Sequence, residues 1–153
     1  MIDYNIIEKN LIDFKPSGKS KNSVIKDMTE MLVKEGRIKD AEAFINNVLE
    51  REEISSTDTG IGIAIPHGKG NFVLESSVAV CRFDKGLIWD KEPVKAVIML
   101  AVKDDEEGQA HLELLAKVST MLMDDDFLAL LFNADSEELL LKDIYRRLDE
   151  KDS

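Results

Sequence analysis

Cysteine is almost absent from the chain, because Cys81 is the only one in 153 residues and no internal disulfide can form. This composition fits a reducing compartment, so we expect a cytoplasmic protein. Cys81 lies in the β-forming run 78–83, where a thiol is expected to be buried and inert rather than nucleophilic. No secretory signal is expected either, since the first residues contain no basic segment followed by an apolar run.

Long apolar runs and basic residues are also scarce. The longest apolar stretch, 96–102, is too short to cross a bilayer, so we expect no membrane insertion. The 20 Lys and Arg are outnumbered by 31 Asp and Glu, and the net charge is −11. Nucleic acid and anionic membranes are therefore poor partners, because both attract clustered cations. A basic protein partner would fit, although the charge alone favours simple solubility.

The residue patterns of several common sites are missing. Two distant histidines and a single cysteine give no metal-ligand spacing, so no metal is expected. Gly62 and Gly68 stand too far apart for a nucleotide phosphate loop, and Lys69 is followed by Gly70 instead of Ser or Thr. The dinucleotide fingerprint and the nucleophile elbow of serine hydrolases are absent as well. The sequence therefore predicts neither a cofactor nor a serine hydrolase.

The apolar periodicity that is present predicts one layered α/β domain over residues 1–153. The run 94–102 is nearly all apolar and β-forming, which predicts a central strand covered on both faces. In chain order we expect helices before Gly36 and after Asp40, strands 63–65, 78–83 and 94–102, a turn at 84–86, a short pairing segment at 87–89, and helices from Gln109 onward.

His67 is the first candidate for chemistry. It follows the short apolar run 63–65 and stands between Pro66 and Gly68, which predicts a rigid turn. Glycines on both sides would let the backbone approach a ligand and leave N–H groups for an anion. A neutral imidazole nitrogen beside such donors can attack phosphorus. From these residues alone, a polar turn without chemistry stays an open alternative.

His111 and Arg51 are the other two candidates. His111 begins a predicted helix on one stripe with Leu115, Val118 and Leu122, and the positive end of that helix favours a nearby anion. The alternative is a first-turn histidine satisfied by backbone or water. Arg51 ends a helix, and its guanidinium could clamp phosphoryl oxygens; a solvated ion pair is the alternative.

The segment 51–69, REEISSTDTGIGIAIPHGK, resembles the active-site signature of type 2 IIA domains of the phosphoenolpyruvate-dependent sugar phosphotransferase system. These domains form the fructose–mannitol–nitrogen family. The resemblance continues at 88–94, 97–102, 111–116 and 126–128, in the family's order and at the family's length. The whole chain, 1–153, is therefore similar to a single domain of this type.

The resemblance implies a single mixed β-sheet with helices packed on both faces. It also implies a phosphotransferase component that works through a phosphohistidine. By position, His67 matches the histidine phosphorylated on Nε2, His111 the second histidine that supports the phosphoryl group, and Arg51 the arginine near the site. The implied donor is the histidine-containing phosphocarrier protein HPr, and the implied acceptor is a IIB component with a membrane IIC component behind it.

Two other functions stay open in the sequence. A nitrogen-type regulatory IIA protein would use the same histidine to control partner binding, and a small-molecule-binding α/β domain would need no chemistry at all. Two residues depart from the family pattern: Asp58 stands where many relatives carry Gly, and Ile61 where many carry Asn, Asp or Glu. Ile61 removes a polar group that often lies near the site.

Overall fold

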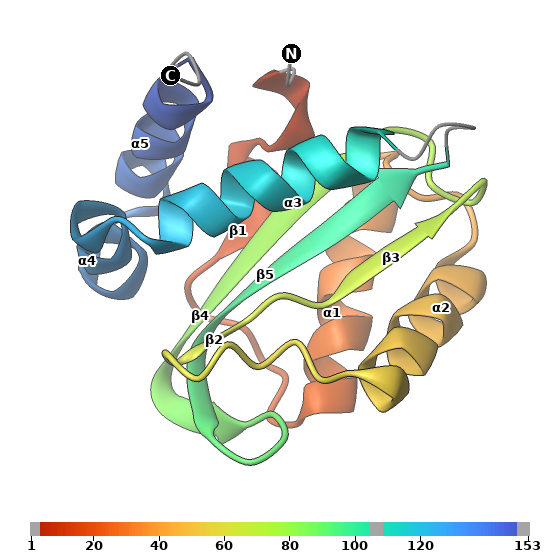
Figure 1. Ribbon diagram of the computed structural model, residues 1–153, viewed down its shortest axis with the longest axis horizontal. Coiled ribbons are helices and arrows are strands. Elements are labelled where there is room, and N and C mark those ends of the chain that lie inside the picture. The colour runs from red at the N-terminus through yellow and green to blue at the C-terminus, as the bar shows by residue number, and fades with distance from the viewer. Residues whose placement is uncertain (1–3, 105–108, 150–153) are drawn as a thin grey trace.

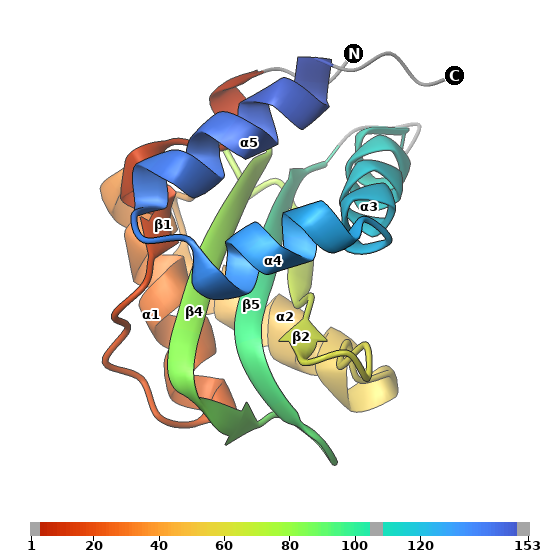
Figure 2. The ribbon, with the colours of Figure 1, turned by 90° about the vertical axis from the view of Figure 1, so that its left-hand side faces the viewer.

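The computed structural model describes residues 4–104 and 109–149 and has three layers. One pair of helices covers one face of a central sheet, and three helices cover the opposite face (Figure 1; Figure 2). The predicted layered architecture with helices on both faces is therefore confirmed. The helices are α1 (Lys21–Lys34) and α2 (Ala41–Ile54) on the first face, and α3 (Gln109–Leu122), α4 (Asp125–Asn133) and α5 (Glu137–Asp149) on the second; short 3₁₀ turns at Tyr4–Ile6 and Lys9–Leu11 precede them.

The sheet has five strands and is mixed, as the resemblance implies. Its centre is an antiparallel pair, β4 and β5; β1 joins β4 in parallel on one side, while β2 and β3 both run parallel to β5 on the other. β2 and β3 follow each other along the same edge of β5 (Figure 1). The strands are β1 (Ile12–Asp13), β2 (Ile63–Ala64), β3 (His67–Gly70), β4 (Ser77–Ile88) and β5 (Pro93–Lys103).

The connection between β4 and β5 differs from the prediction. Residues 84–86 do not form the expected turn; β4 continues through them with a shift of register between Arg82 and Leu87. Gly86 is needed because a Cβ at this position would lie 2.9 Å from the Cβ of Pro93 on β5. The chain reverses only after Ile88, so the glycine marks a close strand-to-strand contact and not a turn.

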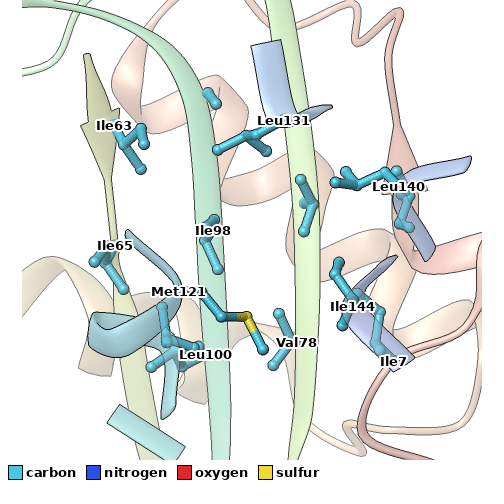
Figure 3. Close-up of a cluster of buried hydrophobic side chains, with 14 of the residues drawn as sticks. Ile7, Ile63, Ile65, Val78, Ile98, Leu100, Met121, Leu131, Leu140 and Ile144 are labelled. Carbon is cyan, nitrogen blue, oxygen red and sulfur yellow. The ribbon is translucent and has the colours of Figure 1, made fainter. Parts of the chain in front are cut away.

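Each face of the sheet carries its own apolar core. On β5, Ile98 and Leu100 belong to the core under α3–α5, while Val97 and Met99 belong to the core under α1 and α2. Side chains of a strand alternate between faces, so β5 is buried on both, as its continuous apolar run predicts. Figure 3 shows the core under α3–α5, where side chains from the strands (Ile63, Val78, Ile98 and Leu100) and from Ile65, between β2 and β3, point toward side chains from the helices (Met121, Leu131, Leu140 and Ile144).

Local signals explain where the first two helices begin. The Ser20 side chain accepts a hydrogen bond from the backbone of Ser23, and the Ser23 side chain bonds back, which closes a capping box at α1. At α2 the Asp40 side chain alone is the cap and accepts from the backbone N–H of Ala43. In the part of the chain that the structure describes, no helix combines the length and apolar character that a membrane span requires.

Candidate functional site

The prediction that His67 lies in a turn is wrong. His67 is the first residue of β3, at the edge of the sheet. The backbone is extended because it pairs with β5: His67 lies opposite Leu100, whose N–H donates to the carbonyl of Pro66 at 3.0 Å. The histidine is therefore mounted on a hydrogen-bonded strand, which holds its backbone more firmly than a loop would.

Gly68 also has a different role from the predicted one. A Cβ at this position would lie 2.8 Å from the Cε1 atom of Phe44 and 3.0 Å from Cγ2 of Val48, both on α2. The glycine therefore lets α2 pack closely against β3. Positive φ angles occur earlier, at Gly60 (+83°) and Gly62 (+87°), where the loop before β2 turns back on itself.

The His67 side chain lies on the face of the sheet opposite Gly68, which is the face covered by α3. It is half-buried, and its Nδ1 atom lies 3.2 Å from the carbonyl oxygen of Ile65. A carbonyl oxygen only accepts, so this contact requires a proton on Nδ1. In the neutral imidazole, the lone pair is then on Nε2.

Arg51 lies in the last turn of α2 and is half-buried. Its Nε atom donates to Oδ1 of Asn47 at 3.2 Å, and the same oxygen accepts from the backbone N–H of Lys69 at 2.9 Å. One amide oxygen thus connects Arg51 to β3, two residues beyond His67. Among the described residues no ion pair involves Arg51, so its two terminal nitrogens are not held by a carboxylate there.

Sequence reasoning missed Asn47. The one local signal was its spacing of one helical turn from Arg51, which puts both side chains on the same side of α2. Its second partner, the backbone of Lys69, is distant in the sequence and leaves no local signal.

The backbone of His111 lies in α3, which begins at Gln109 as predicted. The imidazole of His111 lies outside the described residues, so its role stays a prediction. The apolar stripe of α3 differs from the predicted one: Leu114, Val118 and Met121 are its buried members, whereas Leu115 and Leu122 are only partly buried at its margin. Both sets have helical spacing, and only packing against β5 selects between them.

The two departures from the family pattern lie in the loop before β2. Oδ1 of Asp58 accepts from the backbone N–H of Gly60 at 3.0 Å, so this carboxylate serves as a turn-forming group within the loop. Ile61 is 49% exposed at the loop's tip, between the two left-handed glycines. Its side chain therefore packs into neither core.

Cys81 is excluded as a nucleophile, as predicted. The side chain is buried in the core under α1 and α2, and burial raises the pKa of the thiol well above its ordinary range. A thiol that stays protonated and cannot reach solvent does not attack a substrate.

The family is defined by comparison with known sequences. The family model described as "Phosphoenolpyruvate-dependent sugar phosphotransferase system, EIIA 2" matches residues 5–146. The chain belongs to this family.

Named relatives agree with this assignment. The chain is 34% identical over 139 residues to the fructose-specific EIIABC component of the phosphotransferase system of Bacillus subtilis strain 168; the match covers 89% of this chain and 22% of that one. It is also 34% identical over 134 residues to the mannitol-specific phosphotransferase enzyme IIA component of Staphylococcus aureus Mu50, with 85% and 88% covered. The chain thus spans about a fifth of the Bacillus relative and most of the Staphylococcus one.

A solved structure confirms the fold. The nitrogen regulatory protein IIA-Ntr of Neisseria meningitidis superimposes with a TM-score of 0.80 at 24% identity, covering 92% of this chain and 97% of that one.

Proposed function

We propose that this chain is a phosphoryl carrier of sugar uptake, in which Nε2 of His67 accepts a phosphoryl group from HPr and passes it to a IIB component. The observation that carries the proposal is the contact between Nδ1 of His67 and the carbonyl of Ile65. A hydrogen bond from Nδ1 to this carbonyl supports a proton on Nδ1 and a nucleophilic lone pair on Nε2.

The transfer forms one bond and breaks another. The Nε2 lone pair of His67 forms a bond to phosphorus, while the bond from phosphorus to the donor's phosphohistidine nitrogen breaks and its electron pair returns to the donor. The Nδ1 proton stays in place, and the Ile65 carbonyl stabilises the positive charge that the phosphorylated ring acquires. The second transfer, to IIB, repeats these steps with His67 as the donor.

Arg51 and His111 would support the phosphoryl group without reacting. Arg51 uses only Nε for Asn47, so its terminal nitrogens can face the phosphoryl oxygens in pairs. His111 lies in the first turn of α3, whose positive end favours an anion. Both assignments follow the family positions of these residues.

The partners follow from family membership and charge. The Bacillus relative is named as an EIIABC component, so its matching part shares a chain with B and C components. The net charge of −11 suits a donor with a basic face, such as HPr. We infer that residues 1–153 form a single cytoplasmic domain that meets HPr, IIB and a membrane IIC component.

The regulatory nitrogen-type alternative is not favoured. The Bacillus and Staphylococcus relatives, both at 34% identity, are named for fructose and mannitol. The nitrogen regulatory protein, at 24% identity, supports only a shared fold.

The proposal is tested with phosphoenolpyruvate, enzyme I and HPr. The chain should gain one acid-labile phosphate, His67→Ala should gain none, and addition of IIB should remove the phosphate from the chain. A chain that stays unphosphorylated, or a His67→Ala variant that still takes phosphate, would overturn the proposal.

A further inference from the structure

Glu52, next to Arg51 on α2, is a buried carboxylate to which the chemistry above gives no role. Its side chain is 2% exposed and forms an ion pair with Nζ of Lys21 at 3.2 Å. The same oxygen, Oε1, accepts from the indole N–H of Trp89 at 2.7 Å. These donors converge on Oε1, whereas Oε2 is buried and has no hydrogen-bond partner among the described residues. Through Oε1, Glu52 joins the start of α1 to the connection between β4 and β5.

The same oxygen also holds the loop that leads to β2. The backbone N–H of Thr57 points to Oε1 of Glu52 at 3.4 Å, and the carbonyl of Thr57 accepts from the N–H of Ile65 at 3.2 Å. The carbonyl of Ile65 in turn lies 3.2 Å from Nδ1 of His67. A continuous hydrogen-bonded chain therefore runs from Glu52 through Thr57 and Ile65 to the imidazole.

Stability alone does not explain this carboxylate. A buried ion pair adds little stability compared with apolar groups of the same volume, because removing both charges from water is costly. What converging donors do supply is a fixed position. Nζ of Lys21 lies 5.5 Å from the centre of the Trp89 ring, so these two donors to Glu52 also constrain each other.

We propose that Glu52 is a positioning residue for phosphoryl transfer, an inference that rests on the function proposed above for His67. Glu52 fixes Thr57, Thr57 fixes Ile65, and the Ile65 carbonyl holds the imidazole in the form with the proton on Nδ1 and the lone pair on Nε2. Glu52 touches neither the phosphoryl group nor His67.

Three substitutions separate this role from a merely structural one. Glu52→Met keeps the side-chain volume but removes the acceptor, while Glu52→Gln keeps an oxygen that can accept from Trp89 and Thr57. Glu53→Gln is the matched control, because Glu53 is the exposed neighbour on the same helix. Circular dichroism checks folding, imidazole ¹⁵N NMR reports which nitrogen of His67 is protonated, and the HPr assay gives the phosphorylation rate.

In Glu52→Met we expect the fraction of His67 with the proton on Nδ1 to fall and phosphorylation to slow by about tenfold, as for a misplaced nucleophile. Glu52→Gln should recover most of both, and Glu53→Gln should match the wild type. A folded Glu52→Met variant with the wild-type tautomer and rate would overturn the inference.

If Glu52→Met does not fold, Trp89→Phe replaces it, since it removes the indole donor and keeps an aromatic ring. The tautomer should shift in the same direction by less, and an unchanged tautomer would count against the inference. The NMR measurement needs no phosphate donor. A wild type that takes no phosphate would thus refute the proposed function, whereas an Nδ1–H population independent of Glu52 would refute only the positioning role.

Discussion

Both faces of the sheet carry an apolar core, but the polar contacts that add to it differ between the two faces. On the face of α1 and α2, polar side chains of α2 reach the edge strand and its leading loop: Asn47 binds the backbone of Lys69, and Glu52 binds that of Thr57. On the face of α3–α5, apolar side chains dominate the contact with the sheet, among them Leu131 and Leu140. The first kind of contact is directional and fixes position, while the second stabilises by burial and tolerates small shifts.

His67 lies on the edge strand β3, where it is close to the helices of both faces. Its backbone is on β3, which α2 holds from one side, and its imidazole points to the side of α3. We therefore expect substitutions under α5 to change stability without changing phosphoryl acceptance, and substitutions between α2 and β3 to change both.

Leu140→Ala should have the largest effect on stability. Leu140 is fully buried where α5 packs over β1 and α4, away from β3. The lost apolar contacts and the remaining cavity should lower the free energy of unfolding by about 2–5 kcal/mol, measured by urea denaturation. Leu139→Ala is the control, because Leu139 is 49% exposed on the same helix. At urea concentrations where Leu140→Ala is still folded, its phosphorylation by HPr should keep the wild-type rate. A slower rate would mean that the two faces of the sheet are coupled.

Gly68→Ala should act on the opposite face and change both properties. The added Cβ would overlap the Phe44 ring, so we expect a loss of about 1–3 kcal/mol in unfolding free energy. Because β3 must move to relieve the overlap, phosphorylation of His67 should also slow. Adding Phe44→Leu makes room for the methyl group, so this second substitution should restore part of the phosphorylation rate. If Gly68→Ala is as stable and as active as the wild type, the contact between α2 and β3 does not position His67.

The fold was largely predictable because its elements have strong local patterns. The apolar run 94–102 became the central strand, and the Ser20 and Asp40 caps begin their helices. The missed features depend on distant contacts. Gly86 lies in a strand because of Pro93 on the neighbouring strand, and packing against the sheet decides which stripe of α3 is buried.

The candidate site was predictable to a smaller extent. The motif located His67, but Gly68 serves packing against Phe44, which is distant in the sequence. Asn47 and Glu52 went unnoticed because polar residues on a helix normally face solvent, and their partners lie in other segments. A sequence pattern identifies residues that react, whereas the residues that position them are identified by three-dimensional contacts.

Asn47→Ala tests the polar contact between α2 and β3, and we expect a smaller effect than that of Gly68→Ala. It removes the shared acceptor of the Lys69 backbone and the Arg51 side chain, so we expect about 1–3 kcal/mol less stability and slower phosphorylation. Asn47→Asp keeps the acceptor oxygen and should retain most of the rate. Asn46→Ala is the control at the exposed neighbouring position. A normal rate in Asn47→Ala would mean that Arg51 and β3 do not need this bridge.

The smallest expected effect is a pH-dependent change in stability from the ion pair of Asp124 and Arg147, which joins α4 to α5. The Arg147 guanidinium, 2.8 Å from Oδ2 of Asp124, and the backbone N–H of Asp126 hold the pKa of the Asp124 carboxyl below its ordinary value. A lowered pKa means that this contact stabilises the fold above about pH 4, the ordinary range of an aspartate, and that the gain is lost as the pH falls through the lowered pKa. Asp124→Asn keeps a capping oxygen for α4 but loses the charge.

The melting temperature of Asp124→Asn should therefore lie below that of the wild type at pH 7 and approach it as the medium becomes more acidic. Asp135→Asn, at an exposed position after α4, should show no such convergence. Phosphorylation at pH 7 should be unchanged in both variants, because the ion pair joins α4 to α5 and not α2 to β3. A constant difference in melting temperature from pH 7 to pH 3 would assign the effect of Asp124 to helix capping instead of charge. The contact of Asp124 would then be a structural cap, in contrast to the charged Glu52 network on the other face.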